Sequence, residues 1–120
     1  MTISSYSSVA LDRVVDGDTV WLYVDLGFNV RIALDFRLYG INAPELEGVQ
    51  KPAGLASKAE VERLLGLGTL RIDVYGIDKY GRWLAVIFVK QADGTELNIN
   101  QTLVTEGYAK PYFGEGPKPV

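Results

Sequence analysis

The chain has 120 residues and a mass of 13.2 kDa, with 48% hydrophobic and 22% charged residues. This composition is typical of one soluble globular domain with a single core. The absence of cysteine and histidine excludes disulfides, thiolate zinc sites, cysteine nucleophiles and imidazole bases. Any catalysis must therefore use carboxylates, arginine, lysine, tyrosine or hydroxyl groups.

The net charge of −3 and the pI near 4.9 argue mildly against a nucleic-acid partner, which usually binds a basic surface. Net charge does not describe a single cleft, however, and a bound metal ion would reverse the local sign. No apolar run is long enough to cross a bilayer, and residues 1–6 lack the features of a secretory signal. We therefore expect a cytoplasmic monomer with no membrane partner, or a secreted protein if a leader has been removed.

Strand patterns dominate the first third of the chain. Residues 6–15 and 19–26 read as strands, and 27–29 as the turn into a third strand over 30–38. In this third strand, apolar residues alternate with other residues, which predicts one core-facing side made of Val30, Ile32, Leu34, Phe36 and Leu38. The other side turns Asp35 and Arg37 toward solvent or a cleft.

The middle of the chain changes to a helical pattern. After a loop over 44–51, Pro52 can open an amphipathic helix that ends near Gly66. Its predicted apolar positions are Ala56, Ala59, Val61, Leu64 and Leu65. Strands are expected over 70–75 and 83–89, and Asn98 is a suitable N-cap for a short helix that ends before Gly107.

Five strands with a helix between the third and fourth match an OB-type barrel, a fold often used for oligonucleotides. We therefore predict an α+β, mainly β fold: a five-stranded OB-type barrel with two short helices. A single domain is expected over residues 1–113, followed by a flexible tail over 114–120.

Three short segments carry the candidate chemistry. The first is Asp-Gly-Asp-Thr at 16–19, which by itself is a common turn. We expect Asp16 to stabilise this turn and Asp18, at the start of a strand, to project from the barrel edge.

The second segment joins Arg37 to the sequence Asn-Ala-Pro-Glu at 42–45. Arg37 alone reads as an exposed residue that pairs with Asp35 or another carboxylate across the sheet, and Glu45 alone as a solvated loop acid. Proline restricts Ala43 to an extended conformation, which would expose the Ala43 carbonyl at a bend.

The third segment is Asp-Lys-Tyr-Gly-Arg at 78–82, which is compatible with a polar hairpin connection. A tyrosine between two cations can also stack on a base or sugar while the cations meet phosphate. Together the three segments supply oxygen ligands, a carboxylate and two arginines, which are the parts needed for metal-assisted phosphodiester cleavage.

In order and spacing these segments resemble the thermonuclease (staphylococcal nuclease-like) family, and the similarity continues through residues 100–110. The resemblance covers about residues 9 to 110. It implies a calcium-dependent nuclease that acts on DNA, RNA or both and leaves 3′-phosphates.

The resemblance also assigns roles. The implied catalytic residues are Arg37, Glu45 and Arg82, with Glu45 as general base or as the group that orients the water. Calcium would be held by Asp18, the Asn42 side chain and the Ala43 carbonyl. Lys79, Tyr80 and Tyr112 would flank the nucleotide.

This chain departs from the family at Asn42, where relatives usually have an aspartate, and it stops before a further helix. The amide keeps an oxygen ligand but removes one negative charge. Two alternatives therefore stay open: a catalytically decayed OB-type module that binds nucleic acid or protein, and a structural component of a larger assembly.

Overall fold

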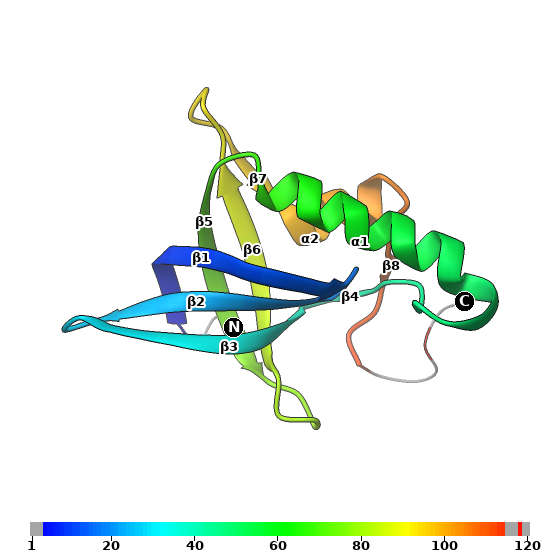
Figure 1. The fold of residues 1–120 in the computed structure, drawn as a ribbon, viewed down its shortest axis with the longest axis horizontal. Coiled ribbons are helices and arrows are strands. Elements are labelled where there is room, and N and C mark those ends of the chain that lie inside the picture. Colours follow the sequence, from blue (N-terminus) through cyan, green and yellow to red (C-terminus); the bar gives the residue numbers. More distant parts are fainter. Residues whose placement is uncertain (1–3, 115–117, 119–120) are drawn as a thin grey trace.

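The computed structural model describes residues 4–114 and 118. Figure 1 shows a mainly β molecule whose strands form a barrel beside two helices. The strands are β1 (Ser4–Asp16), β2 (Thr19–Gly27), β3 (Val30–Leu38), β4 (Ile41–Asn42), β5 (Thr69–Ile77), β6 (Trp83–Lys90), β7 (Glu96–Asn98) and β8 (Lys110–Pro111). The helices are α1 (Lys51–Leu65) and α2 (Ile99–Thr105), and a 3-10 turn, η1 (Gly48–Gln50), precedes α1.

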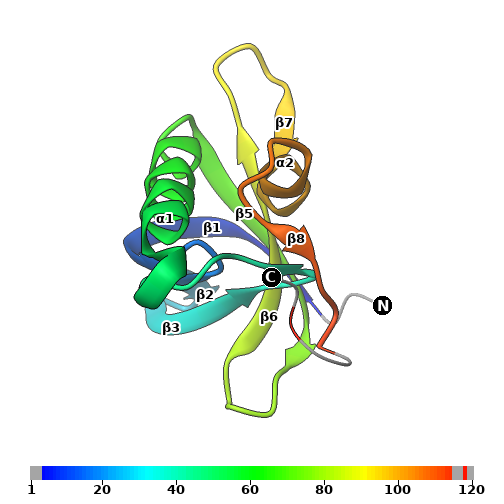
Figure 2. The same ribbon diagram turned by 90° about the vertical axis from the view of Figure 1, so that its right-hand side faces the viewer.

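Five long strands close into a barrel. The sheet has the order β3-β2-β1-β5-β6-β7, and a parallel pairing of β3 with β6 joins its ends. Closure depends on β1, which pairs with β5 through its first half and with β2 through its second half. The predicted five-stranded OB-type barrel with two helices is therefore confirmed (Figures 1 and 2).

The three shortest strands were not predicted. β7 extends the sheet beside β6, whereas β4 and β8 form a separate two-stranded ladder. Each has only two or three residues, too few to show a period of two. The β4–β8 ladder matters for the site because it holds the segment after β3 against the end of the chain.

The predicted core face of β3 is only partly correct. Phe36 and Leu38 are buried, but Val30 and Ile32 are 48% and 39% exposed. The β2–β3 hairpin projects beyond the barrel, so its tip has no opposite sheet to pack against (Figure 1). At the tip, Phe28 and Asn29 both have positive φ, as a two-residue hairpin turn requires.

Helix α1 buries a different set of residues from the one predicted. Val61, Leu64 and Leu65 are buried as expected, but Ala56 and Ala59 face solvent. The remaining buried positions of the helix are Gly54, Ser57 and Glu60. Gly54 must be small because the helix lies close to the backbone of Glu45 there. The charge of the buried Glu60 is compensated by Arg63, which pairs with it at 2.6 Å.

Helix α2 follows its prediction. The Asn98 side chain accepts a hydrogen bond from the backbone N–H of Gln101 at 3.0 Å, as an N-cap does. The chain then turns at Gly107, whose φ is +83°. Within residues 4–114 and 118, no helix is long and apolar enough to cross a membrane. Most of the predicted tail, residues 115–117 and 119–120, lies outside the described residues.

Candidate active site

The turn between β1 and β2 carries Asp18 into the protein rather than out of it. Asp16 accepts a hydrogen bond from the Asp18 backbone N–H at 3.0 Å, which stabilises the turn as predicted. Asp18 is only 8% exposed, so its expected projection from the barrel edge is wrong. Its Oδ2 accepts a hydrogen bond from the backbone N–H of Ala43 at 2.8 Å.

Two glycines allow this burial. A Cβ on Gly17 would lie 2.6 Å from the Cβ of Ala43 and 2.7 Å from that of Ser57. A Cβ on Gly54 would collide with the backbone carbonyl of Glu45. Helix α1 can therefore hold both the turn and the following loop in place only because these two positions lack a side chain.

Arg37 binds the buried carboxylate. It lies opposite Thr19 in the β2–β3 ladder, and its Nη1 is 3.1 Å from Asp18 Oδ2. Its Nη2 donates to Asn42 Oδ1 at 3.4 Å. The Arg37 side chain is 11% exposed, so its expected exposure is wrong, and its partner is not Asp35 but another carboxylate, Asp18, which the prediction also allowed. The β2–β3 register, rather than distance along the chain, selects its partner.

The pKa of Asp18 is displaced from its ordinary value. Burial raises the pKa of Asp18 to about 6, against the opposing effect of the Arg37 guanidinium. The neighbouring Asp16 raises the Asp18 pKa further, and the Ala43 backbone N–H lowers it. A cation beside Asp18 therefore compensates a carboxylate that burial destabilises.

The loop after β4 brings Glu45 to the surface. The Ala43 residue is buried, at 4% exposure, although its carbonyl was expected to be exposed at a bend. Glu45 is exposed, and its backbone N–H donates to the Gln50 side chain at 2.9 Å. Within the described part of the chain, its carboxylate forms no hydrogen bond or ion pair.

The loop between β5 and β6 positions Arg82 through Asp78. Asp78 Oδ1 accepts from the backbone N–H groups of Tyr80 at 2.8 Å and Arg82 at 3.0 Å. Asp78 Oδ2 accepts from Arg82 Nε at 3.0 Å and pairs with its Nη2 at 3.0 Å. Burial alone would raise the pKa of Asp78, but these N–H groups and the guanidinium outweigh it and lower that pKa.

A chain of polar contacts connects the two arginines. Arg82 Nη1 donates to the Thr19 hydroxyl at 3.5 Å, and that hydroxyl donates to Asp18 Oδ1 at 3.3 Å. Asp18 then contacts Arg37 on its other oxygen. Arg37 of β3 therefore contacts the Asp18 carboxylate directly, whereas Arg82 of the β5–β6 loop is linked to it through the buried Thr19 hydroxyl.

A cavity of about 310 Å³ opens beside these arginines. The sequence-predicted residues that line it are Arg37, Arg82, Lys79, Tyr80 and Tyr112. Tyr80 is 72% exposed, with Lys79 Nζ 5.3 Å and Arg82 Cζ 5.5 Å from its ring centre. Phe113 forms another part of the wall and contacts the Tyr39 ring edge to face at 5.4 Å.

The predicted metal ligands Asp18, Asn42 and Ala43 are not among the residues that line this cavity, and neither is Glu45. Asp18 and Asn42 are connected to the cavity through Arg37, which lines it. Asp18 Oδ2 and Asn42 Oδ1 converge on the Arg37 guanidinium. Among residues 4–114 and 118, no three acidic side chains form a cluster that could hold a metal ion. Asp18 thus supplies the only carboxylate of the predicted ligand set.

Sequence reasoning assigned no role to Thr19, Asp78, Gln50, Gly17 or Gly54. Asp78 carried a usable signal, because an aspartate in a turn often binds the backbone N–H two residues later. Gly54 carried another, since a glycine inside a helical pattern is costly unless something packs closely against it. The link through Thr19 depends on the tertiary structure and had no such signal.

The fold and these contacts define a small OB-type barrel with a cationic, aromatic-lined site at one end. The chain matches the family model described as staphylococcal nuclease homologue over residues 35–119. Because this match covers more than half of the chain, the protein belongs to that family. The match includes every predicted site residue except Asp18.

A similar protein is the uncharacterized protein MJ1439 of Methanocaldococcus jannaschii, with 31% identity over 124 aligned positions. The alignment covers 84% of this chain but only 57% of that relative. The chain therefore spans little more than half the length of this relative.

Proposed function

We propose that this protein is a calcium-dependent nuclease that hydrolyses phosphodiester bonds of DNA, RNA or both and leaves 3′-phosphates. The observation that carries the proposal is the convergence of Arg37 and Arg82 on Asp18 and Thr19. Two guanidinium groups beside one cavity, one from strand β3 and one from the β5–β6 loop, suit a phosphate with charge on several oxygens.

The two arginines would bind the phosphate and stabilise the additional charge of the five-coordinate transition state. Arg82 presents Nη1 toward the site because Asp78 occupies its Nε and Nη2. Arg37 would have to give up part of its contact with Asp18 or Asn42 to reach a phosphate oxygen. The arginines therefore have different tasks: Arg82 is oriented in advance, whereas Arg37 exchanges partners.

Glu45 would accept the proton of the attacking water or orient that water. Its exposed carboxylate is not held by neighbouring described residues, and its backbone is fixed by Gln50 and by the close approach to Gly54. Water oxygen would bond to phosphorus while the bond to the 5′-oxygen breaks. The departing oxygen would take a proton from solvent, and the phosphate would stay on the 3′ side.

The donor chemistry fits calcium, because Asp18, Asn42 and the Ala43 carbonyl offer only oxygen ligands. Two of these oxygens already converge on one cation, at 3.1 and 3.4 Å from the Arg37 nitrogens. A bound ion would supply Lewis-acid stabilisation of phosphate charge. The single carboxylate of this set predicts weak calcium binding before substrate adds its own oxygens.

Lys79, Tyr80 and Tyr112 would hold the nucleotide beside the cleaved bond. Tyrosine rings can stack on a base, and Lys79 adds a positive charge at the rim of the cavity. A cavity of about 310 Å³ has the size of a site for one small ligand unit rather than a long duplex.

The direct test uses fluorogenic single-stranded DNA and RNA substrates, first with calcium and then with EGTA. Cleavage that EGTA abolishes and that Glu45→Gln lowers at least a hundredfold is expected. Arg71→Ala is a matched control, because Arg71 pairs with Glu96 and Asp73 on the outer surface of the barrel. Absence of cleavage in both metal conditions would contradict the proposal.

A specific observation also favours a second candidate, a decayed module that binds nucleic acid or protein without cutting it. Asn42 replaces the usual acid, and Arg37 neutralises Asp18, so the predicted metal ligands carry little net negative charge. Binding of an oligonucleotide without cleavage in the same assay would select this alternative.

A further inference from the structure

The outer face of β2 carries two aromatic side chains that the core does not use. Val20, Leu22 and Val24 point into the barrel and are buried, so Trp21 and Tyr23 point outward. Tyr23 is 37% exposed and Trp21 is half-buried. Both helices lie beyond β1, on the side away from β2 and β3, and leave this face uncovered (Figures 1 and 2).

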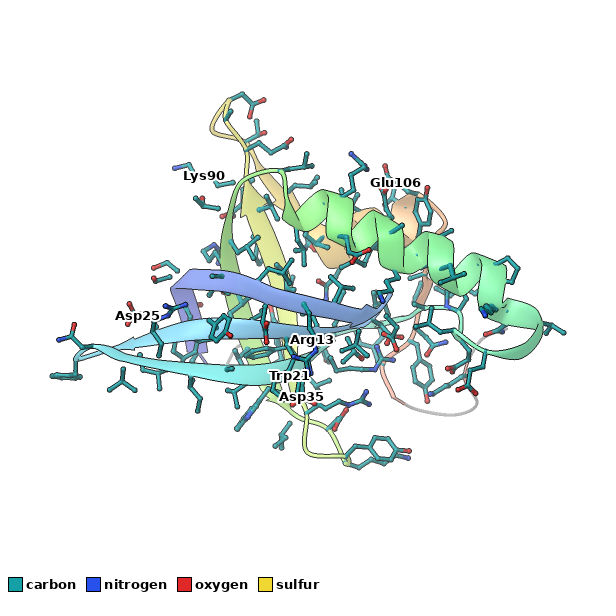
Figure 3. The ribbon with its side chains drawn as sticks, in the orientation of Figure 1. Arg13, Trp21, Asp25, Asp35, Lys90 and Glu106 are labelled. Carbon is teal, nitrogen blue, oxygen red and sulfur yellow. The ribbon has the colours of Figure 1, made fainter. Side chains whose placement is uncertain are left out.

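An arginine lies over each aromatic ring. Arg13 of β1 is opposite Trp21, with its Cζ 4.9 Å from the ring centre. Arg31 of β3 lies over Tyr23 at 5.1 Å. Figure 3 shows Arg13, Trp21 and Asp35 in a row across the three strands. Rings and guanidinium planes thus alternate on one sheet face, a combination that binds the bases and phosphates of single strands.

This row is continuous with the candidate active site. Thr19 and Arg37 form the first pair on this side of the β2–β3 ladder, where both are largely covered, and Trp21 with Asp35 forms the next pair on the same side. Outward positions of a strand repeat about every 6.6 Å, roughly twice the 3.4 Å spacing of stacked bases in a duplex strand. The spacing therefore suits an extended single strand whose bases have separated from one another.

We propose that the outer face of β2, with Trp21, Tyr23, Arg13 and Arg31, binds the continuation of a single-stranded nucleic acid that leaves the cleavage site. This inference rests on the proposed function, because the strand enters the face from the phosphate held by Arg37 and Arg82. One nucleotide occupies the cavity on one side of the cleaved bond, and the next two nucleotides lie over Trp21 and Tyr23.

Stacking rather than charge dominates this binding. Asp12 pairs with Arg13 at 3.2 Å, and Asp25 and Asp35 lie opposite Arg31 and Trp21. These three carboxylates more than balance the two guanidinium groups of the face, so few counterions are released when a strand binds. Affinity for long substrates consequently falls only gently with added salt.

Fluorescence can test the contact without catalysis. The chain has two tryptophans, so Trp83→Phe leaves Trp21 as the only one. A phosphorothioate octathymidylate titrated in EGTA should quench Trp21 emission, and a blunt duplex of equal length should quench it much less. Binding seen by anisotropy without any change in Trp21 emission would overturn the inference.

The activity test compares an octanucleotide with a dinucleotide that reaches only the cleavage site. Trp21→Val removes the ring but keeps a residue that favours strands. In this variant, kcat/KM for the octanucleotide divided by kcat/KM for the dinucleotide should fall roughly tenfold, because KM for the octanucleotide rises. Trp21→Phe should restore most of the ratio. Phe88→Val is the control, because Phe88 lies under Arg71 in the same kind of pair on β6.

The two hypotheses fail differently. If the wild type cleaves neither substrate, the proposed function is wrong, and the fluorescence titration still decides whether the face binds a strand. If the wild type cleaves both substrates and Trp21→Val keeps the wild-type ratio of kcat/KM values, the inference is wrong. The outer face of β2 would then be a candidate surface for a protein partner instead.

Discussion

Two aspartate-containing turns supply the site, and they are built in opposite ways. In residues 16–19, Asp16 closes the turn by accepting the Asp18 N–H, and helix α1 packs so closely that Gly17 has no room for a side chain. In residues 78–82, Asp78 closes the loop in the same manner, but a Cβ on Gly81 would meet open space. The first turn fixes a buried carboxylate, and the second presents a cation on an exposed loop.

The difference indicates how one site combines rigidity with access. Asp18 must be held where burial raises its pKa to about 6, which requires tight packing on several sides. Arg82 must reach a substrate, and its position depends on one carboxylate rather than on packing. Substitutions around Asp18 and around Arg82 should therefore lower activity to a similar extent, but those around Asp18 should lower stability more.

The largest expected effect is the loss of turnover when either arginine is removed, and the accompanying loss of stability should differ between the two. Arg37→Ala and Arg82→Ala should each lower turnover by roughly two to four orders of magnitude, because both stabilise transition-state charge. Arg37→Ala should also cost about 3 kcal/mol of folding free energy, since it leaves Asp18 buried without its partner. Arg82→Ala should be far less destabilising, because Asp78 keeps its two backbone donors.

Turnover and urea unfolding of both variants check this prediction. Equal losses of stability would contradict the expected difference between the arginine partners of buried Asp18 and of Asp78. Activity within threefold of the wild type for Arg82→Ala would remove this residue from the mechanism.

The second prediction concerns pH, where the two aspartates respond in opposite directions. The Asp18 pKa rises from 3.8 to about 6 on folding, so the folded state binds this proton more tightly. The free energy of unfolding should therefore fall as pH rises from about 4 to about 6, by an amount on the order of 3 kcal/mol. The pKa of Asp78 is lowered, so its stabilising contribution is present above about pH 4 and is lost below it.

Urea unfolding between pH 3 and pH 7 tests both signs. Asp18→Asn should flatten the slope between pH 4 and pH 6, and Asp78→Asn should flatten the slope below pH 4. If the free energy of unfolding of the wild type rises between pH 4 and pH 6 and that of Asp18→Asn does not, folding lowers the Asp18 pKa instead of raising it.

The third prediction compares the glycines of the two turns. Gly17→Ala should destabilise the fold by about 2–3 kcal/mol, because its Cβ would overlap Ala43 and Ser57. Gly81→Ala should cost only about 1 kcal/mol, which is the strain of a φ of +85° in open space. Chemical denaturation measures both, and the reverse order would contradict the packing of α1 on the first turn.

The sequence predicted the parts of this molecule that follow long local patterns. The five barrel strands and Asn98 as an N-cap were visible because alternation and capping act over neighbouring residues. The partner of Arg37 was not visible, because the β2–β3 register and the fold of β4 bring Asp18 to it from 19 positions away. The buried face of α1 was misread for a related reason: Gly54 and Ser57 are buried by close approach, which hydrophobicity does not report.

The smallest expected effect concerns Asn42, the residue that most weakens the predicted calcium site. Asn42→Asp keeps an oxygen at the same place and adds one negative charge, so calcium affinity should rise about tenfold, or about 1.4 kcal/mol. The new carboxylate would also attract Arg37, whose Nη2 is 3.4 Å from the present amide oxygen, and this competition limits the gain. The gain should be largest when a nucleotide 3′,5′-bisphosphate draws Arg37 toward its phosphate. Calorimetric titration of calcium into both proteins, with and without the bisphosphate, tests this reasoning. Equal calcium affinities of the two proteins in both titrations would show that Asn42 is not a ligand.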